Sequence, residues 1–186
     1  SRIERIDAIE MNVSCPNVNK GGLQFSSDPL VLKKLVREVR NVSKKFLIVK
    51  LSPNVTDITL LARAAEEEGA DALAVCNTFL GMKIDTKSGK PYLANRTGGL
   101  SGPAIKPIAL NLVYETVRTV KIPVLGIGGI STYDDALEFL MVGAKAVQIG
   151  TANYIDPMAT VKVINGIRTW CQKNNISKIS NINVIK

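Results

Sequence analysis

The sequence of 186 residues contains no histidine, only three cysteines and no long apolar run. Without histidine, Ser–His and Cys–His nucleophilic pairs and the commonest metal ligand in proteins are excluded. Cys15, Cys76 and Cys171 are odd in number and lack C-x-x-C spacing, which argues against a disulfide framework or a zinc site. Free thiols are therefore expected, and any acid or base must be Cys, Lys, Asp, Glu or Tyr.

Segments that would direct the chain to a membrane are also missing from the sequence. No apolar run approaches the roughly 18 residues of a membrane span, and the first residues, SRIERIDAIE, lack the apolar stretch of a signal peptide. The hydrophobic content of 46% suffices for a sizeable core, and no Pro/Gly-rich linker divides the chain. We expect one cytosolic (cytoplasmic) domain over residues 1–186, without membrane contact.

The formal net charge of +8 favours an anionic ligand. Nucleic acid is a weaker interpretation, because the lysines are spread over expected helices and the C-terminal tail and are not interleaved with aromatic residues. A solvated basic surface and no nucleic-acid partner are expected.

Short apolar segments alternate regularly with amphipathic segments of helical period. The apolar segments predict five strands, at 7–13, 46–52, 72–78, 122–128 and 146–151. The amphipathic segments predict helices at 29–42, 57–68, 106–120, 133–142 and 157–173. Ser27-Asp28-Pro29 and Ser131-Thr132 are plausible helix starts, and Gly69 and Gly143 are plausible stops.

This alternation predicts a parallel sheet, either doubly wound or part of a (β/α)₈ barrel. In both architectures ligands bind at the carboxyl ends of the strands. The unusual residues of this sequence lie at these strand ends: 12–17 after the first expected strand, Lys50 in the second, Asn77-Thr78 after the third, and Gly128-Gly129 and Gly150-Thr151 after the last two.

One long insertion, at 79–101, interrupts the alternation. It contains a polar stretch around 87–90 that is typical of a hairpin, and it runs into GGLSGPA at 98–104. A loop of this length in a compact fold is commonly a lid, a binding loop or a partner surface.

Two glycine motifs, GIGGI at 126–130 and QIGT at 148–151, end the last two expected strands. In a (β/α)₈ barrel the last two strand ends commonly bind phosphate, because glycine lets backbone N–H groups approach the anion. Either motif alone could merely turn a strand into a helix, but two in succession favour phosphate. The segment 98–102 is either a third backbone cradle or a flexible loop.

Two side chains stand out against their surroundings. Lys50 lies within the apolar run LIVKLSP, where a charge is costly unless it meets a partner, although a lysine at a strand end can also reach solvent. Cys76 and Cys171 have the apolar neighbours of core cysteines, whereas Cys15 lies in a polar loop after a strand. There a nearby positive potential could lower the thiol pKa and make Cys15 a base.

Six motifs occur in a specific order: MNVSCPN, VKLSPN, CNTFLGMKID, NRTGGLSGPAIKP, IPVLGIGGIST and QIGTANYIDP. In this order and spacing the chain resembles the C-terminal two-thirds of class 1 dihydroorotate dehydrogenases, most closely the class 1B, NAD-linked branch. The flavin domain of dihydropyrimidine dehydrogenase is similar, but more distantly.

The resemblance implies a TIM barrel of which this chain holds about five of the eight strand–helix units, beginning at the fourth. It implies FMN-dependent oxidation of dihydroorotate to orotate in pyrimidine biosynthesis, with Cys15 taking the C5 proton. It assigns Asn12, Asn17, Asn77 and Thr78 to the substrate, and Lys50, Ser101, Gly102, Gly128, Gly129, Gly150 and Thr151 to FMN.

The resemblance also implies partners. Class 1B enzymes pass electrons to a subunit that carries FAD and a [2Fe-2S] cluster, and a homodimer is expected beside it. Three scattered cysteines are too few for such a cluster here. Two alternatives remain open: a related FMN barrel that acts on another pyrimidine, and a non-catalytic barrel fragment.

Overall fold

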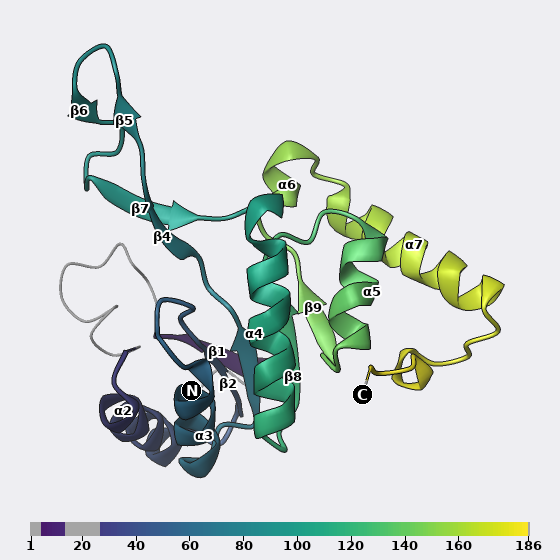
Figure 1. Ribbon diagram of the computed structural model, residues 1–186. Helices are drawn as coiled ribbons and strands as arrows, with labels where there is room; N and C mark the ends of the chain where they lie inside the picture. The colour runs from purple at the N-terminus through teal and green to yellow at the C-terminus, as the bar shows by residue number, and fades with distance from the viewer. Residues whose placement is uncertain (1–4, 14–26, 186) are drawn as a thin grey trace.

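The computed structural model describes residues 5–13 and 27–185, and its centre is a five-stranded parallel sheet (Figure 1). The strand order is β1-β2-β3-β8-β9, so each strand of the sheet lies beside the next one along the chain. All five predicted strands are confirmed. They are β1 (Ala8–Asn12), β2 (Phe46–Lys50), β3 (Ala72–Val75), β8 (Val124–Ile127) and β9 (Ala146–Gln148).

Helices follow the strands and pack against one another in chain order. The five predicted helices are confirmed as α2 (Pro29–Val42), α3 (Ile58–Glu67), α4 (Lys106–Thr119), α5 (Tyr133–Met141) and α7 (Ala159–Lys173). Three short turns accompany them: η1 (Pro103–Ile105), α6 (Ala152–Ile155) and η2 (Ile179–Asn181). Among the described residues, no helix is both long and apolar enough to cross a bilayer.

The helix ends carry the predicted signals. The Asp28 side chain accepts a hydrogen bond from the Leu30 N–H at the start of α2, and Thr132 and Asp135 form a reciprocal capping box at the start of α5. Gly69 and Gly143 end their helices with φ values of 91° and 107°. These left-handed conformations favour glycine, which explains why both helices stop there.

The core lies between the sheet and the helices. In β2, Leu47 and Val49 are buried, while the alternate residues Ile48 and Lys50 face the other side of the sheet and are only partly covered. Gly126 of β8 makes room for Phe139 of α5, since a Cβ at this glycine would lie 2.5 Å from the ring. This packing leaves the side of the sheet that bears Lys50 available for a site.

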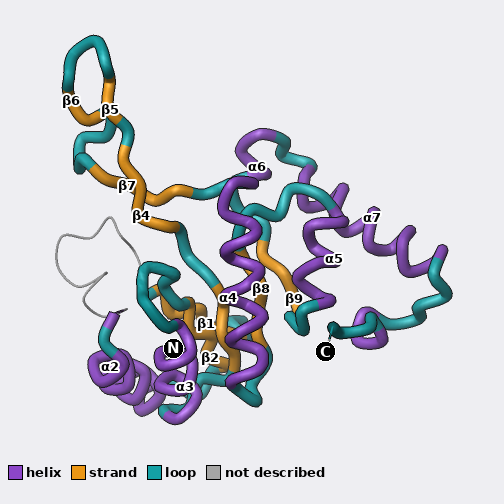
Figure 2. Tube along the Cα trace, in the orientation of Figure 1, coloured by secondary structure: helices purple, strands orange, loops and turns teal. Residues whose placement is uncertain are grey.

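The insertion forms an arm that projects from the body (Figures 1 and 2). In it β4 (Phe79–Met82) pairs antiparallel with β7 (Thr97–Leu100), and β5 (Ile84–Asp85) pairs with β6 (Lys90–Pro91). The hairpin predicted around 87–90 is confirmed. Gly98 and Gly99 belong to β7, so the segment 98–102 is neither a single cradle nor a flexible loop, and only its end turns toward the strand ends.

The two outer strands should make the 186-residue chain associate. Within the described residues β1 pairs only with β2 and β9 only with β8, and unpaired strand edges attract further strands. Phe46 adds an apolar group, 45% exposed, on the open side of β2. Light scattering should therefore give a mass above the 20.1 kDa of one chain, and less association for Phe46→Lys. A monodisperse 20.1 kDa species would contradict this expectation.

Candidate functional site

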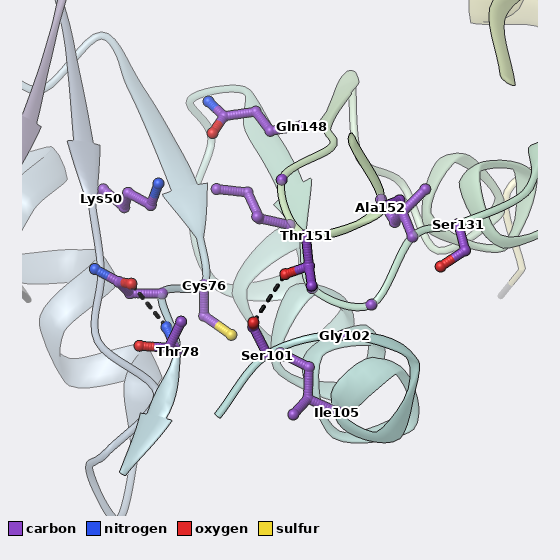
Figure 3. Close-up of a pocket in the computed structure, with 16 residues that line it drawn as sticks. Lys50, Cys76, Thr78, Ser101, Gly102, Ile105, Ser131, Gln148, Thr151 and Ala152 are labelled. Carbon is purple, nitrogen blue, oxygen red and sulfur yellow. Dashed lines mark hydrogen bonds between the residues drawn. The ribbon is translucent and has the colours of Figure 1, made fainter. Parts of the chain in front are cut away.

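A pocket lies at the carboxyl ends of β2, β3, β8 and β9, where parallel sheets place their ligands (Figure 3). Its cavity volume is about 160 Å³. Every predicted cofactor-binding residue lines it: Lys50, Ser101, Gly102, Gly128, Gly129, Gly150 and Thr151. The predicted substrate-binding residues Asn77 and Thr78 line it as well. Residues from far-apart motifs are thus brought to one cavity.

Glycine is required where the loop after β8 meets the η1 turn and the start of α4. Gly128 and Gly129 have φ values of 136° and 72°, which disfavour other residues. A Cβ on Gly129 would lie 2.8 Å from the Gly102 carbonyl oxygen and 2.9 Å from the Lys106 nitrogen, so the two loops touch. No atom lies within 4 Å of a Cβ built on Gly150, and the backbone there is open to a ligand. This combination of tight loops and open backbone fits a bound phosphate.

Two hydroxyl groups complete this end of the pocket. The Thr151 Oγ1 donates to Ser101 Oγ at 2.8 Å, which links the end of the arm to the loop after β9 (Figure 3). Hydroxyl groups both donate and accept, so they can also bind phosphate oxygens. The donors present fit the phosphate group of a nucleotide cofactor.

An ion-pair network between α4 and α5 stabilises the loop after β8. Lys106 Nζ donates to Asp135 Oδ1 at 2.7 Å and to Glu138 Oε1 at 2.8 Å, joining α4 to α5. Asp135 Oδ2 accepts from the backbone N–H groups of Ser131 and Thr132 at 2.9 and 2.8 Å. Burial alone would raise the pKa of Asp135, but the lysine and the N–H groups outweigh burial and lower the pKa to about 2. Asp135 is therefore ionised at neutral pH.

The turn after β3 is held by amide side chains. Asn77 Nδ2 donates to Asn12 Oδ1 at 3.1 Å, which brings predicted substrate-binding residues of β1 and of this turn together. Asn54 clamps the same turn, because its Nδ2 donates to the Thr78 carbonyl at 3.0 Å and its Oδ1 accepts from the Leu80 N–H at 2.8 Å. Asn54 belongs to the VKLSPN motif, but sequence reasoning gave it no role.

Lys50 and Cys76 both line the pocket. Lys50 Nζ lies 3.4 Å from Glu10 Oε1. This ion pair offsets the cost of placing a lysine in an apolar strand. Cys76 is 1% exposed, as expected for a core cysteine, but it also lines the pocket. Burial raises the pKa of its thiol to about 12, although Lys50 opposes the shift. Cys76 is thus an inert wall group at neutral pH.

Two predicted residues, Cys15 and Asn17, lie outside the described residues. Their roles remain predictions, as do the roles of the residues that line the pocket. Gln148 and Ser131 also line the pocket and were not predicted. Gln148 is part of the quoted QIGT motif, whereas Ser131 was interpreted only as a helix start.

Fold and pocket together define a segment of a (β/α)₈ barrel whose pocket lies at the carboxyl ends of the strands. A family model described as dihydroorotate dehydrogenase matches residues 2–170, and the chain belongs to this family. The chain is 50% identical over 182 residues to "Dihydroorotate dehydrogenase B (NAD(+)), catalytic subunit" of Parabacteroides distasonis, and 53% identical over 180 residues to the protein of the same name from a Thermoanaerobacter species. These matches cover 98% and 97% of the chain, which spans about 60% of the length of either relative.

Solved structures agree on the fold. The crystal structure of DHODH in complex with ferulenol from Eimeria tenella superposes with a TM-score of 0.77 at 24% sequence identity, over 96% of this chain and 53% of that one. The predicted TIM-barrel class is thereby confirmed, and the five parallel strands fit a partial barrel. The predicted likeness to the class 1B branch is also confirmed.

Asp135→Asn should destabilise the protein by about 1–3 kcal/mol at neutral pH, since the charged hydrogen bonds to Lys106 and two N–H groups are lost. The folded-state pKa of about 2 lies below the unfolded value, so this stabilisation is complete above about pH 4 and is lost as the pH falls toward 2. Chemical denaturation at several pH values measures it.

The matched control is Asp134→Asn, an exposed neighbour in the same first helical turn. It should cost far less stability, because only its interaction with the helix end is removed. Equal losses in the two variants, or a difference between them that persists unchanged at pH 2, would contradict the network.

Proposed function

We propose that this chain is the FMN-binding part of an enzyme that oxidises dihydroorotate to orotate in pyrimidine biosynthesis. The observation that carries the proposal is the convergence of every predicted cofactor-binding residue on one pocket. The names of the relatives, at 50–53% identity, support the substrate. The basic charge of the chain suits both anions, the phosphate of FMN and the carboxylate of dihydroorotate.

The cofactor half of the proposal uses the glycine loops. Backbone groups of Gly128, Gly129 and Gly150 and the hydroxyl of Thr151 would bind the FMN phosphate, with Ser101 and Gly102 beside it. Lys50 would face the ring system, where a cation favours the negative charge of the reduced form. FMN, when bound, supplies the acceptor for the hydride of the substrate.

The substrate half uses amides and a thiol. Asn12, Asn17, Asn77 and Thr78 would hydrogen-bond the carboxylate and ring amides of dihydroorotate, a task for groups that donate and accept. Cys15 would take the C5 proton. An unperturbed thiol pKa of about 8.5 needs only a modest downward shift for work near neutrality.

The word "subunit" in the names of the relatives supports an assembly with other chains. We propose that the electrons leave through a second subunit with FAD and a [2Fe-2S] cluster, and that two copies of this chain associate in the cytoplasm. The described residues contain only two cysteines, Cys76 and Cys171, both buried and unpaired. Cluster ligands would therefore come from the partner.

Gly129→Leu should release FMN. Its side chain would collide with the Gly102 carbonyl and the backbone of Lys106, and the left-handed φ would be strained, so the two loops would separate. The flavin absorbance retained by the purified protein measures the effect. Gly89→Leu is the control: it also has positive φ, but it lies in the arm with no atom within 4 Å of its Cβ. Unchanged flavin content in Gly129→Leu would make the glycine motif a simple turn.

Cys15→Ala should abolish turnover while FMN stays bound, since the base is lost and the phosphate loops are untouched. The measurement is bleaching of the flavin by dihydroorotate, in a protein of the relatives' full length that contains these residues. Cys15→Ser should keep some activity that rises with pH.

Two outcomes of the same assay would overturn the proposal in different ways. If dihydrouracil but not dihydroorotate bleached the flavin of the parent protein, the substrate would be another pyrimidine. If Cys15→Ala turned over at the parent rate, the substrate assignment would stand, but Cys15 would not be the base. A parent protein without flavin would favour a non-catalytic fragment.

A further inference from the structure

A carboxylate lies behind the pocket and contacts two of the side chains that line it. Glu10 Oε1 lies 3.4 Å from Lys50 Nζ, and Glu10 Oε2 accepts a hydrogen bond from Gln148 Nε2 at 2.7 Å. Lys50 and Gln148 line the pocket. Figure 3 shows both extending from their strands into the space around it. Each oxygen of Glu10 thus has its own partner.

The geometry of the sheet explains how these three residues meet. Glu10 lies two residues before Asn12 on β1, so both project from the same side of the strand. Asn12 is aligned with Lys50 of β2, which therefore projects from that side too. Gln148 lies on β9, at the opposite edge of the sheet. A hydrogen bond between the two outermost strands requires the sheet to curl around Glu10, as a barrel wall does.

The ion pair with Lys50 explains why a charged residue is suited to position 10. The side chains of Glu10 and Lys50 are 29% and 20% exposed, so either charge alone would lose much of its hydration. A lysine without this partner would be free to turn toward solvent. Glu10 fixes the lysine amine on the pocket side and also orients the Gln148 amide.

We propose that Glu10 is a positioning residue that holds Lys50 and Gln148 against the pocket and offsets the positive charge presented to the bound ligand. The inference rests on the proposed function where the ligand is FMN. A cation near the ring favours the reduced, negatively charged flavin. The carboxylate beside the cation opposes this effect, so Glu10 lowers the midpoint potential of the flavin.

The contact is tested first on the chain without flavin. Acetic anhydride labels a lysine amine more slowly when an ion pair with a carboxylate holds the amine in place, and mass spectrometry gives the rate at Lys50. Glu10→Gln should raise this rate about two- to fivefold, the factor expected for a partly exposed ion pair. Glu10→Asp keeps the charge and should give an intermediate rate, which also covers the case in which Glu10→Gln does not fold.

The matched control is Glu115→Gln, which removes an exposed carboxylate from α4 on the outside of the sheet. It changes the net charge equally and should leave the labelling of Lys50 unchanged. A Lys50 rate that is the same in the parent, Glu10→Gln and Glu10→Asp would overturn the inference. So would an equal rise in the Glu115→Gln control.

The charge effect is tested on the FMN-loaded protein. Redox titration should give a more positive midpoint potential for Glu10→Gln than for the parent and for Glu115→Gln. Bound flavin with an unchanged or more negative potential in Glu10→Gln would overturn the electrostatic role of Glu10. A parent chain that binds no FMN would count against the proposed function instead, and the labelling rates would still decide whether Glu10 holds Lys50.

Discussion

The parallel direction of the five strands is the constraint on which the site depends. Parallel strands bring all their carboxyl ends to one side, so every loop that follows a strand begins at the same edge of the sheet. Lys50 of β2, Asn77 after β3, Gly128 after β8 and Gly150 after β9 are far apart in the chain and share one pocket for this reason. Hydrogen bonding between the strands brings the starts of these loops to one edge of the sheet, but it does not fix the conformation of the loops.

Side chains that hydrogen-bond to backbone groups fix the conformation of these loops. Asn54 bonds the carbonyl of one residue and the N–H of another two positions on, as a neighbouring strand would. Asp135 accepts two N–H groups of the loop after β8 and is itself held by Lys106. An amide serves where a donor and an acceptor face it, and a carboxylate serves where donors alone do. The chemistry of each loop therefore dictates the type of residue that holds it.

The same distinction explains how far the sequence could be interpreted. The five strands of the sheet, the five long helices, the capping signals and the hairpin around 87–90 depend on residues close together in the chain, and the sequence predicts them within a few residues of their observed bounds. It does not predict the pairing of β4 with β7. Glu10, Asn54 and Gln148 act through contacts with residues 24 to 138 positions away, and no local pattern reports such a partner. Gly98 and Gly99 were misjudged for a related reason: their fit beside β4 and Thr78 exists only once the arm is folded.

The described lining of the pocket contains no evident general base. Its lining supplies a cation, amides, hydroxyl groups and glycine backbone, but none of the lining residues is Asp, Glu or Tyr. Burial raises the pKa of the one thiol among them, Cys76, to about 12, so this thiol is protonated at neutral pH. Lys50 Nζ is paired with Glu10 Oε1 at 3.4 Å. For the reaction proposed above, the proton acceptor is therefore expected outside the described lining. Residue 15 follows β1 by three positions, and Asn12 at the end of β1 contacts Asn77 in the pocket wall. Cys15 therefore remains the predicted base, because it follows the strand whose last residue contacts the pocket wall.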